Sequence, residues 1–207
     1  MGEGITVAMA LVDCIPVVLF FIAAVILQRD LYPYLVKGAY SLVAAGSIMA
    51  FLGGMFKAAW KLLYALNVCD YVLLDHALFT LQGPGFLLFF LGLTGLFFHK
   101  KKKDVVLPAA APVVFTSSMP FIIMQVIGLG GAQAVLAAAA AKNRSRTAPI
   151  MFTLSFVFML GMGYLGSKFD DSSSMHWIAQ VTNILSMVFF LLGVLCLRRA
   201  GYQNLKK

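Results

Sequence analysis

Charged residues are scarce in this chain: Asp, Glu, Lys and Arg make up 12% of its 207 residues, and 61% of the residues are hydrophobic. A soluble domain usually has about twice that charged fraction. Several apolar runs reach the roughly 20 residues that cross a hydrocarbon core of about 30 Å. These features exclude a soluble enzyme and indicate a multi-pass protein of a cell membrane, almost entirely embedded, with the lipid bilayer as its main partner.

The sequence also lacks motifs for metal or cofactor chemistry. Its three cysteines are scattered, with no CxxC or Cys/His spacing. There is no P-loop and no GxSxG element, and 175–197 has no lysine for a retinal Schiff base. We therefore expect no cofactor, and enzyme activity is disfavoured. The net charge of +8 comes mainly from short basic loops, as membrane topology requires, so nucleic acid is not an expected partner.

The number of crossings depends on one long apolar segment, 105–141. The others lie at about 5–28, 35–56, 76–98, 148–167 and 175–197. If 105–141 crosses twice, all Lys and Arg residues except Lys57, Lys61 and Lys168 lie on one side, and short cytoplasmic loops collect such residues. The sequence therefore predicts an all-α fold of seven transmembrane helices, N-terminus outside and C-terminus in the cytoplasm. Six helices are the alternative.

Two further segments are interpreted from local signals. The first of the two crossings, 105–117, would span only about 20 Å and contains two prolines. The second begins at 119, after serines and before Pro120, a favourable helix start. The stretch 57–75 is predicted to be an external linker with an amphipathic interfacial part, because its basic and aromatic residues recur at helical spacing.

Three helices, a linking helix and three more suggest a parallel duplication. A shift of 100 residues aligns His76 with His176, and Leu52-Gly53 recurs as Leu160-Gly161. The chain would form a single transmembrane domain, 1–207, with halves 5–98 and 119–199 joined by 105–117. This architecture resembles the SWEET and PQ-loop sugar and amino-acid transporters, although the Pro-Gln dipeptide of the PQ-loop family is absent from the first and fifth helices. The resemblance implies a solute site near the membrane midplane.

Polar side chains gather in the outer parts of the predicted helices. Four of them lie about 8–13 Å below the outer helix starts, on four different helices, and others lie nearer the rim. The inner halves of these helices look nearly bare of such groups. Because polar groups in hydrocarbon are costly and often functional, we expect a polar pocket that opens outward. The candidate ligand-binding residues are Asp13, Gln82, Gln125, Asn183, His76, Gln180, Trp177 and Lys57.

Asp13 is the only acidic residue placed well inside a predicted helix. It is interpreted as a ligand or proton site, as part of a structural ion pair with Lys57 as its partner, or as a residue close enough to the membrane rim to stay hydrated. In the third predicted helix, 82–85 reads Gln-Gly-Pro-Gly, which favours either an interrupted helix that lines a site or a kink for packing. The glycines at 128–131 indicate close helix packing.

Three functions follow from these features. The first is a small-solute transporter or substrate-binding membrane protein. The second is a seven-helix receptor that signals through a separate partner subunit, since its own loops are short. The third is an intramembrane lipid-modifying enzyme that uses His76, His176 and nearby aspartates, including Asp170 and Asp171. A homo-oligomer is compatible with each.

Overall fold

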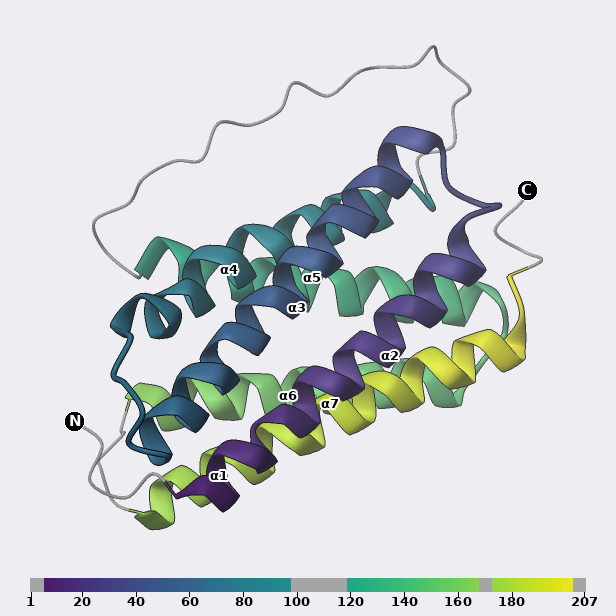
Figure 1. The fold of residues 1–207 in the computed structure, drawn as a ribbon. Coiled ribbons are helices and arrows are strands. Elements are labelled where there is room, and N and C mark those ends of the chain that lie inside the picture. Colours follow the sequence, from purple (N-terminus) through teal and green to yellow (C-terminus); the bar gives the residue numbers. More distant parts are fainter. Residues whose placement is uncertain (1–5, 98–118, 168–172, 203–207) are drawn as a thin grey trace.

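The computed structural model describes residues 6–97, 119–167 and 173–202, and most of this part of the chain is α-helical (Figure 1). Six stretches are long and apolar enough to cross a membrane, with α1 and α2 together making one of them. The chain is thus a multi-pass membrane protein. The helices are α1 (Val7–Val12), α2 (Cys14–Leu31), α3 (Lys37–Ala65), α4 (Val72–Thr94), α5 (Met119–Lys142), α6 (Thr147–Ser167) and α7 (Ser173–Ala200).

A single residue, Asp13, separates α1 from α2. Pro16 lies near the start of α2 and has no N–H, so the carbonyl of Val12 loses its usual helical partner. The other end of α1 is capped, because the Thr6 hydroxyl accepts a hydrogen bond from the Met9 N–H at 3.2 Å. The first span is therefore nearly continuous, with Asp13 at its one irregular point.

Close contacts at glycines give the direction in which neighbouring helices run. A Cβ on Gly83 of α4 would lie 2.6 Å from the Phe121 oxygen of α5, and one on Gly128 would lie 2.4 Å from the Leu87 nitrogen. Residue numbers rise together along this contact, so α4 and α5 are parallel. The contact of α2 with α7 is also parallel, since the Phe20 ring stacks on Phe190 and Gln180 bonds to the chain just before α2.

The remaining neighbours are antiparallel pairs. Gly46 of α3 faces Phe89 of α4, whereas Gly92 of α4 faces Val43 of α3, so numbers fall along α3 as they rise along α4. In the same way α6 is antiparallel to α7, since Gly161 meets Thr182 and Gly193 meets Phe152. Each span packs against the next along the chain, and α7 packs against α2, which closes the bundle. Consequently α2, α4, α5 and α7 point one way, and α3 and α6 point the other (Figure 1).

The centre of the bundle is an aromatic cluster on α2, α4 and α7. The Phe20 ring lies edge-on to Phe86 at 5.4 Å and stacks on Phe190 at 6.1 Å, and Phe89 is fully buried beside them. Such ring pairs add about 0.5–1.5 kcal/mol beyond the area they bury. This cluster joins the first half of the chain to the last helix.

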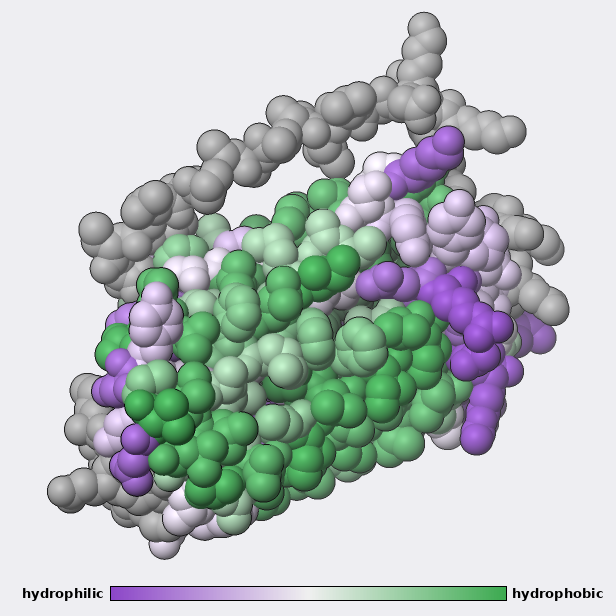
Figure 2. Space-filling model, viewed as in Figure 1, coloured by the Kyte–Doolittle hydropathy of each residue, from purple (hydrophilic) through white to green (hydrophobic). Residues whose placement is uncertain are grey.

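The surface is divided into a wide hydrophobic band and two hydrophilic ends (Figure 2). One end, here called the basic end, contains the C-terminal ends of α2, α4, α5 and α7. Its described charged residues are seven basic and one acidic: Arg29, Lys37, Lys142, Arg144, Arg146, Arg198, Arg199 and Asp30. The opposite end, here called the far end, has three acidic and two basic described residues: Asp13, Asp70, Asp75, Lys57 and Lys61.

Within the described residues the predicted helices agree with the observed ones except at the end of α3. The prediction of a linker from residue 57 is wrong, because α3 continues as a regular helix to Ala65. The Gln-Gly-Pro-Gly stretch leaves α4 continuous, and its glycines are buried contact points, which corresponds to the packing interpretation. The predicted crossing at 105–117 lies outside the described residues.

Candidate functional site

Two ion pairs join the helices at the far end. Lys61 of α3 pairs with Asp13, and Lys57 of the same helix pairs with Asp75 at the start of α4. The predicted partner of Asp13, Lys57, is therefore wrong. The reason is the length of α3: its extra turns carry Lys61 to the level of Asp13 and leave Lys57 to Asp75. Asp13 does take part in an ion pair, with this different lysine.

Aromatic contacts extend this charged cluster. The Lys57 ammonium lies 4.7 Å from the centre of the Trp60 ring, and the Trp60 indole N–H donates a hydrogen bond of 2.9 Å to Asp70. An ion pair, a cation–π contact and a hydrogen bond thus hold together α3, the loop after it and α4. The side chains of Asp13 and Lys61 are largely buried, so removal of either would leave the other charge without its partner.

Below the ion pairs, a chain of hydrogen bonds connects α3, α4 and α5. The Gln125 amide donates to the Gln82 side-chain oxygen at 3.3 Å, and the Gln82 amide donates to the Ala50 carbonyl at 3.2 Å. The Gln82 side chain fits here because Gly53 and Gly54 have no side chains. A Cβ on Gly53 would lie 2.8 Å from it, and one on Gly54 would lie 3.1 Å from it. The Gln125 side-chain oxygen is buried and has no hydrogen-bond partner among the described residues.

Gln180 makes a second polar contact between distant segments. Its amide donates to the Met9 carbonyl at 3.0 Å and so ties α7 to α1. The residue is 5% exposed, and its own side-chain oxygen has no partner in the described part of the chain. A buried acceptor of this kind costs free energy unless a solute or a water molecule donates to it.

The other predicted site residues are less closely associated with these contacts. His76 is exposed near the start of α4, and Trp177 is 40% exposed on α7. Asn183 is half-buried on α7, and none of the described residues hydrogen-bonds to its side chain. Within the described ranges no three His, Cys, Asp or Glu side chains gather as metal ligands. Asp170 and Asp171 lie outside those ranges.

Sequence reasoning missed two polar pairs nearer the basic end. The Gln28 amide donates to the Ser47 hydroxyl at 2.7 Å, and the Gln133 amide donates to the Ser155 hydroxyl at 2.9 Å. Ser186 donates to the Ser155 carbonyl at 3.0 Å. The prediction that the inner halves are nearly bare is therefore wrong, because it overlooked Gln28 and Gln133, which lie in the inner halves of the first and fifth predicted helices.

The two Gln–Ser pairs have a detectable sequence signal. Ser47 and Ser155 each begin the pattern Ser-x4-Leu-Gly, which ends at Gly53 and Gly161, 108 residues apart in both cases. These glycines meet equivalent positions of the following helix: Gly53 faces Gln82, and Gly161 faces Thr182, 100 residues later. The pairings α3–α4 and α6–α7 thus use the same register.

We expect Ser155→Ala to lower the free energy of unfolding by about 1–3 kcal/mol, because the buried Gln133 amide would lose its partner. The measurement is reversible unfolding in mixed micelles. Thr153→Ala is a matched control on α6, since the Thr153 side chain is exposed and its hydroxyl bonds only to its own helix. Equal stability of the two variants would contradict a structural role for the pair.

Comparison with known protein families, with curated proteins and with solved structures finds no match for this chain.

Proposed function

We propose that this protein is a membrane transporter for a small polar solute, with Gln82 and Gln125 in its binding site. The observation that carries the proposal is the hydrogen-bond chain from Ala50 through Gln82 to Gln125, which ends in a buried oxygen that has no donor among the described residues. A buried carbonyl oxygen of this kind accepts a hydrogen bond from a hydroxyl or amine group of a solute. Interior polar groups of membrane helices commonly mark such pathways.

The proposed scaffold is a parallel duplication, with α2, α3 and α4 repeated as α5, α6 and α7. Three observations support it: the repeated Gln–Ser pair, the shared register of Gly53 and Gly161, and the parallel direction of both α4–α5 and α7–α2. Gln82 and Gln125 then lie in different halves, at the contact between them. A solute bound there senses any movement of one half against the other, as transport requires.

We further propose a seventh crossing between Thr94 and Met119 and a cytoplasmic location of the basic end. The parallel direction of α4 and α5 supports the extra crossing, because the end of α4 and the start of α5 lie at opposite ends of the bundle. The excess of Lys and Arg at the basic end supports the orientation. The N-terminus would then be outside, and the far end would face outward.

In this arrangement the solute enters from the far end. The Asp13–Lys61 and Lys57–Asp75 ion pairs would form the entrance, together with His76, Gln180, Trp177 and Asn183. Gln82 and Gln125 would form the base of the pocket. The amides donate and accept at once, so they suit neutral solutes with several hydroxyl or amide groups. Sugars and amino acids are the classes to test first.

The test is uptake into liposomes that contain the purified protein, with a panel of radiolabelled sugars, amino acids and nucleosides. We expect at least one solute to enter faster than in protein-free liposomes. Gln125→Leu should then reduce the uptake about tenfold, because one hydrogen bond to a neutral group contributes roughly 1.4 kcal/mol.

Thr80→Val is the matched control, since Thr80 also lies in a membrane span, but its side chain is exposed and its hydroxyl bonds only to its own helix. Its uptake should remain near that of the unaltered protein. Equal uptake by Gln125→Leu and Thr80→Val, with both variants folded by size-exclusion chromatography, would contradict the proposed site. Specific binding of a panel member without any flux would favour the receptor instead.

A further inference from the structure

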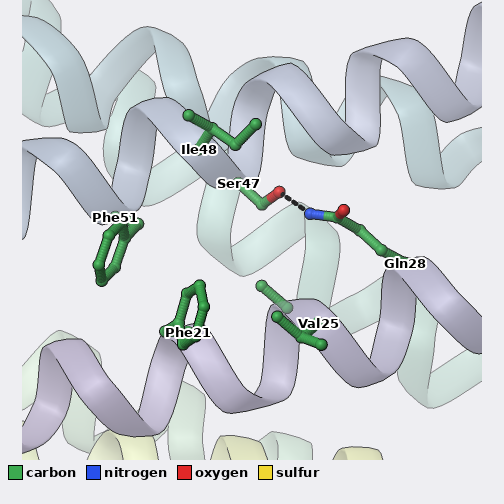
Figure 3. Close-up of a pocket in the computed structure, with 7 residues that line it drawn as sticks. Phe21, Val25, Gln28, Ser47, Ile48 and Phe51 are labelled. Atoms are coloured by element: carbon green, nitrogen blue, oxygen red, sulfur yellow. Dashed lines mark hydrogen bonds between the residues drawn. The ribbon is translucent and has the colours of Figure 1, made fainter.

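A groove opens on the lipid-facing side of the bundle between α2 and α3 (Figure 3). Phe21 and Phe51 meet across it with ring centres 4.9 Å apart, and the hydrogen bond between Gln28 and Ser47 spans it seven residues further along α2. The groove has a volume of about 40 Å³, and its lining residues are Phe21, Ala24, Val25, Gln28, Ser47, Ile48 and Phe51.

The groove is narrow and mainly apolar. Drug-sized ligands occupy pockets of about 300–1,000 Å³, so this shallow groove suits a short segment of a hydrocarbon chain lying against it and not a compact molecule. Phe21, Val25 and Ile48 are 46%, 46% and 54% exposed, on the side where a bilayer would lie. From Phe21 to Gln28 the helix rises about 10 Å. A hydrocarbon chain from the surrounding membrane fits these properties.

The Gln28–Ser47 pair at the end of the groove is more accessible than its counterpart in the second half of the chain. In the second half of the chain the equivalent pair, Gln133 and Ser155, is almost completely buried, at 2% and 0% exposure. Gln28 is only half-buried, so a ligand in the groove reaches it, while Ser47 lies behind it. The two pairs thus differ in access although their hydrogen bonds are alike.

The Gln28 amide has hydrogen-bonding capacity to spare. One N–H donates to Ser47, whose own hydroxyl donates to the Ala44 carbonyl at 2.9 Å. None of the other described residues bonds to this side-chain amide, so a second N–H remains for a ligand. In a bilayer the groups that accept such a bond just below the headgroups are the ester carbonyls of lipids.

Basic and aromatic residues lie between Gln28 and the basic end, where the headgroup of a lipid in the groove would be. Gln28 lies three residues before the end of α2, and the exposed Arg29 follows it directly. Lys37, also exposed, begins α3 at the same end. The rings of Tyr32 and Tyr40 lie edge to face at 5.0 Å beside these basic residues, and aromatic residues favour the headgroup level.

We propose that the groove between α2 and α3 binds an anionic phospholipid from the leaflet at the basic end. One acyl chain lies along Val25 and Ile48, an ester carbonyl accepts from Gln28, and the phosphate pairs with Arg29 and Lys37. Basic clusters at a membrane surface attract anionic headgroups by about 1 kcal/mol for each Lys or Arg. This site is separate from the Gln82–Gln125 site and does not depend on the proposed transport.

The test is native mass spectrometry of the delipidated full chain in detergent, titrated with phosphatidylglycerol or with phosphatidylcholine of the same acyl chains. We expect one phosphatidylglycerol to bind tightly, with phosphatidylcholine weaker. Val25→Trp should abolish the tight binding by filling the groove. Val157→Trp is the matched control, because Val157 is an exposed valine at 56% on α6.

Two gentler variants separate lost binding from lost folding. Arg29→Gln combined with Lys37→Gln should weaken phosphatidylglycerol about thirtyfold and phosphatidylcholine less, because the choline cation already offsets the charge of its phosphate. Gln28→Leu keeps the groove open but removes the donor, and it should weaken both lipids. Equal phosphatidylglycerol binding by Val25→Trp and Val157→Trp, or equal binding of the two lipids by the unaltered chain, would overturn the proposal.

Discussion

Cysteines placed at Phe97 and at Met119 are expected to react with an impermeant maleimide from opposite sides of the membrane. Both side chains are exposed, at 40% and 64%; Phe97 follows α4, and Met119 is the first residue of α5. Because α4 and α5 are parallel, these two positions lie at opposite ends of the bundle. The effect is all-or-none, since a reagent confined to one side labels one of the two positions and not the other.

The labelling is done in intact cells and in inverted vesicles, in a chain without Cys14, Cys69 and Cys196. Arg144→Cys lies between α5 and α6 at the basic end and should label with Phe97→Cys from the cytoplasm. Asn67→Cys lies between α3 and α4 at the far end and should label with Met119→Cys from outside. If Phe97→Cys and Met119→Cys labelled from the same side, the seventh crossing and the duplication would both be wrong.

Gly46→Ala is expected to destabilise the protein by about 3 kcal/mol, although it adds only one methyl group. Its Cβ would lie 2.4 Å from the Phe89 nitrogen and 2.5 Å from the Gly85 oxygen, both in the backbone of α4. Backbone atoms cannot rotate away, so α3 and α4 would have to separate along their whole contact. The measurement is unfolding in mixed micelles, with yield after membrane extraction as a second readout.

Gly163→Ala on α6 is the matched control for this substitution. A Cβ at Gly163 meets nothing within 4 Å, so the change should be neutral or stabilising by up to about 1 kcal/mol through helix propensity. If both alanines had the same effect, helix propensity rather than the close approach of α3 and α4 would decide stability at Gly46.

Most of the helical architecture could be predicted from hydrophobic runs, because a bilayer requires about 20 apolar residues for each helix. The end of α3 could not be predicted in this way. Its last turns carry Lys57, Trp60 and Lys61, whose polarity is typical of a loop, and they remain helical because their charges pair with Asp13 and Asp75. The partners lie far away in the sequence, so no local pattern reveals them.

The candidate site was predictable in part. The depth of Gln82 and Gln125 along their helices follows from counting residues, and the structure brings these two together. Asn183 lies at a similar predicted depth, but no hydrogen bond joins it to the other described residues. The rotation of each helix about its axis decides which polar groups meet, and helices that are apolar on all sides give little information about that rotation.

The unequal directions of the helices also have an electrical consequence. Four spans have their C-termini at the basic end and two have their N-termini there, so the helix dipoles do not cancel. Each C-terminus is equivalent to about half a negative charge. Arg29, Lys142, Arg198 and Arg199 occupy the last turns of α2, α5 and α7 and neutralise it. The basic residues from which we propose the orientation in the membrane therefore also stabilise the helices that they terminate.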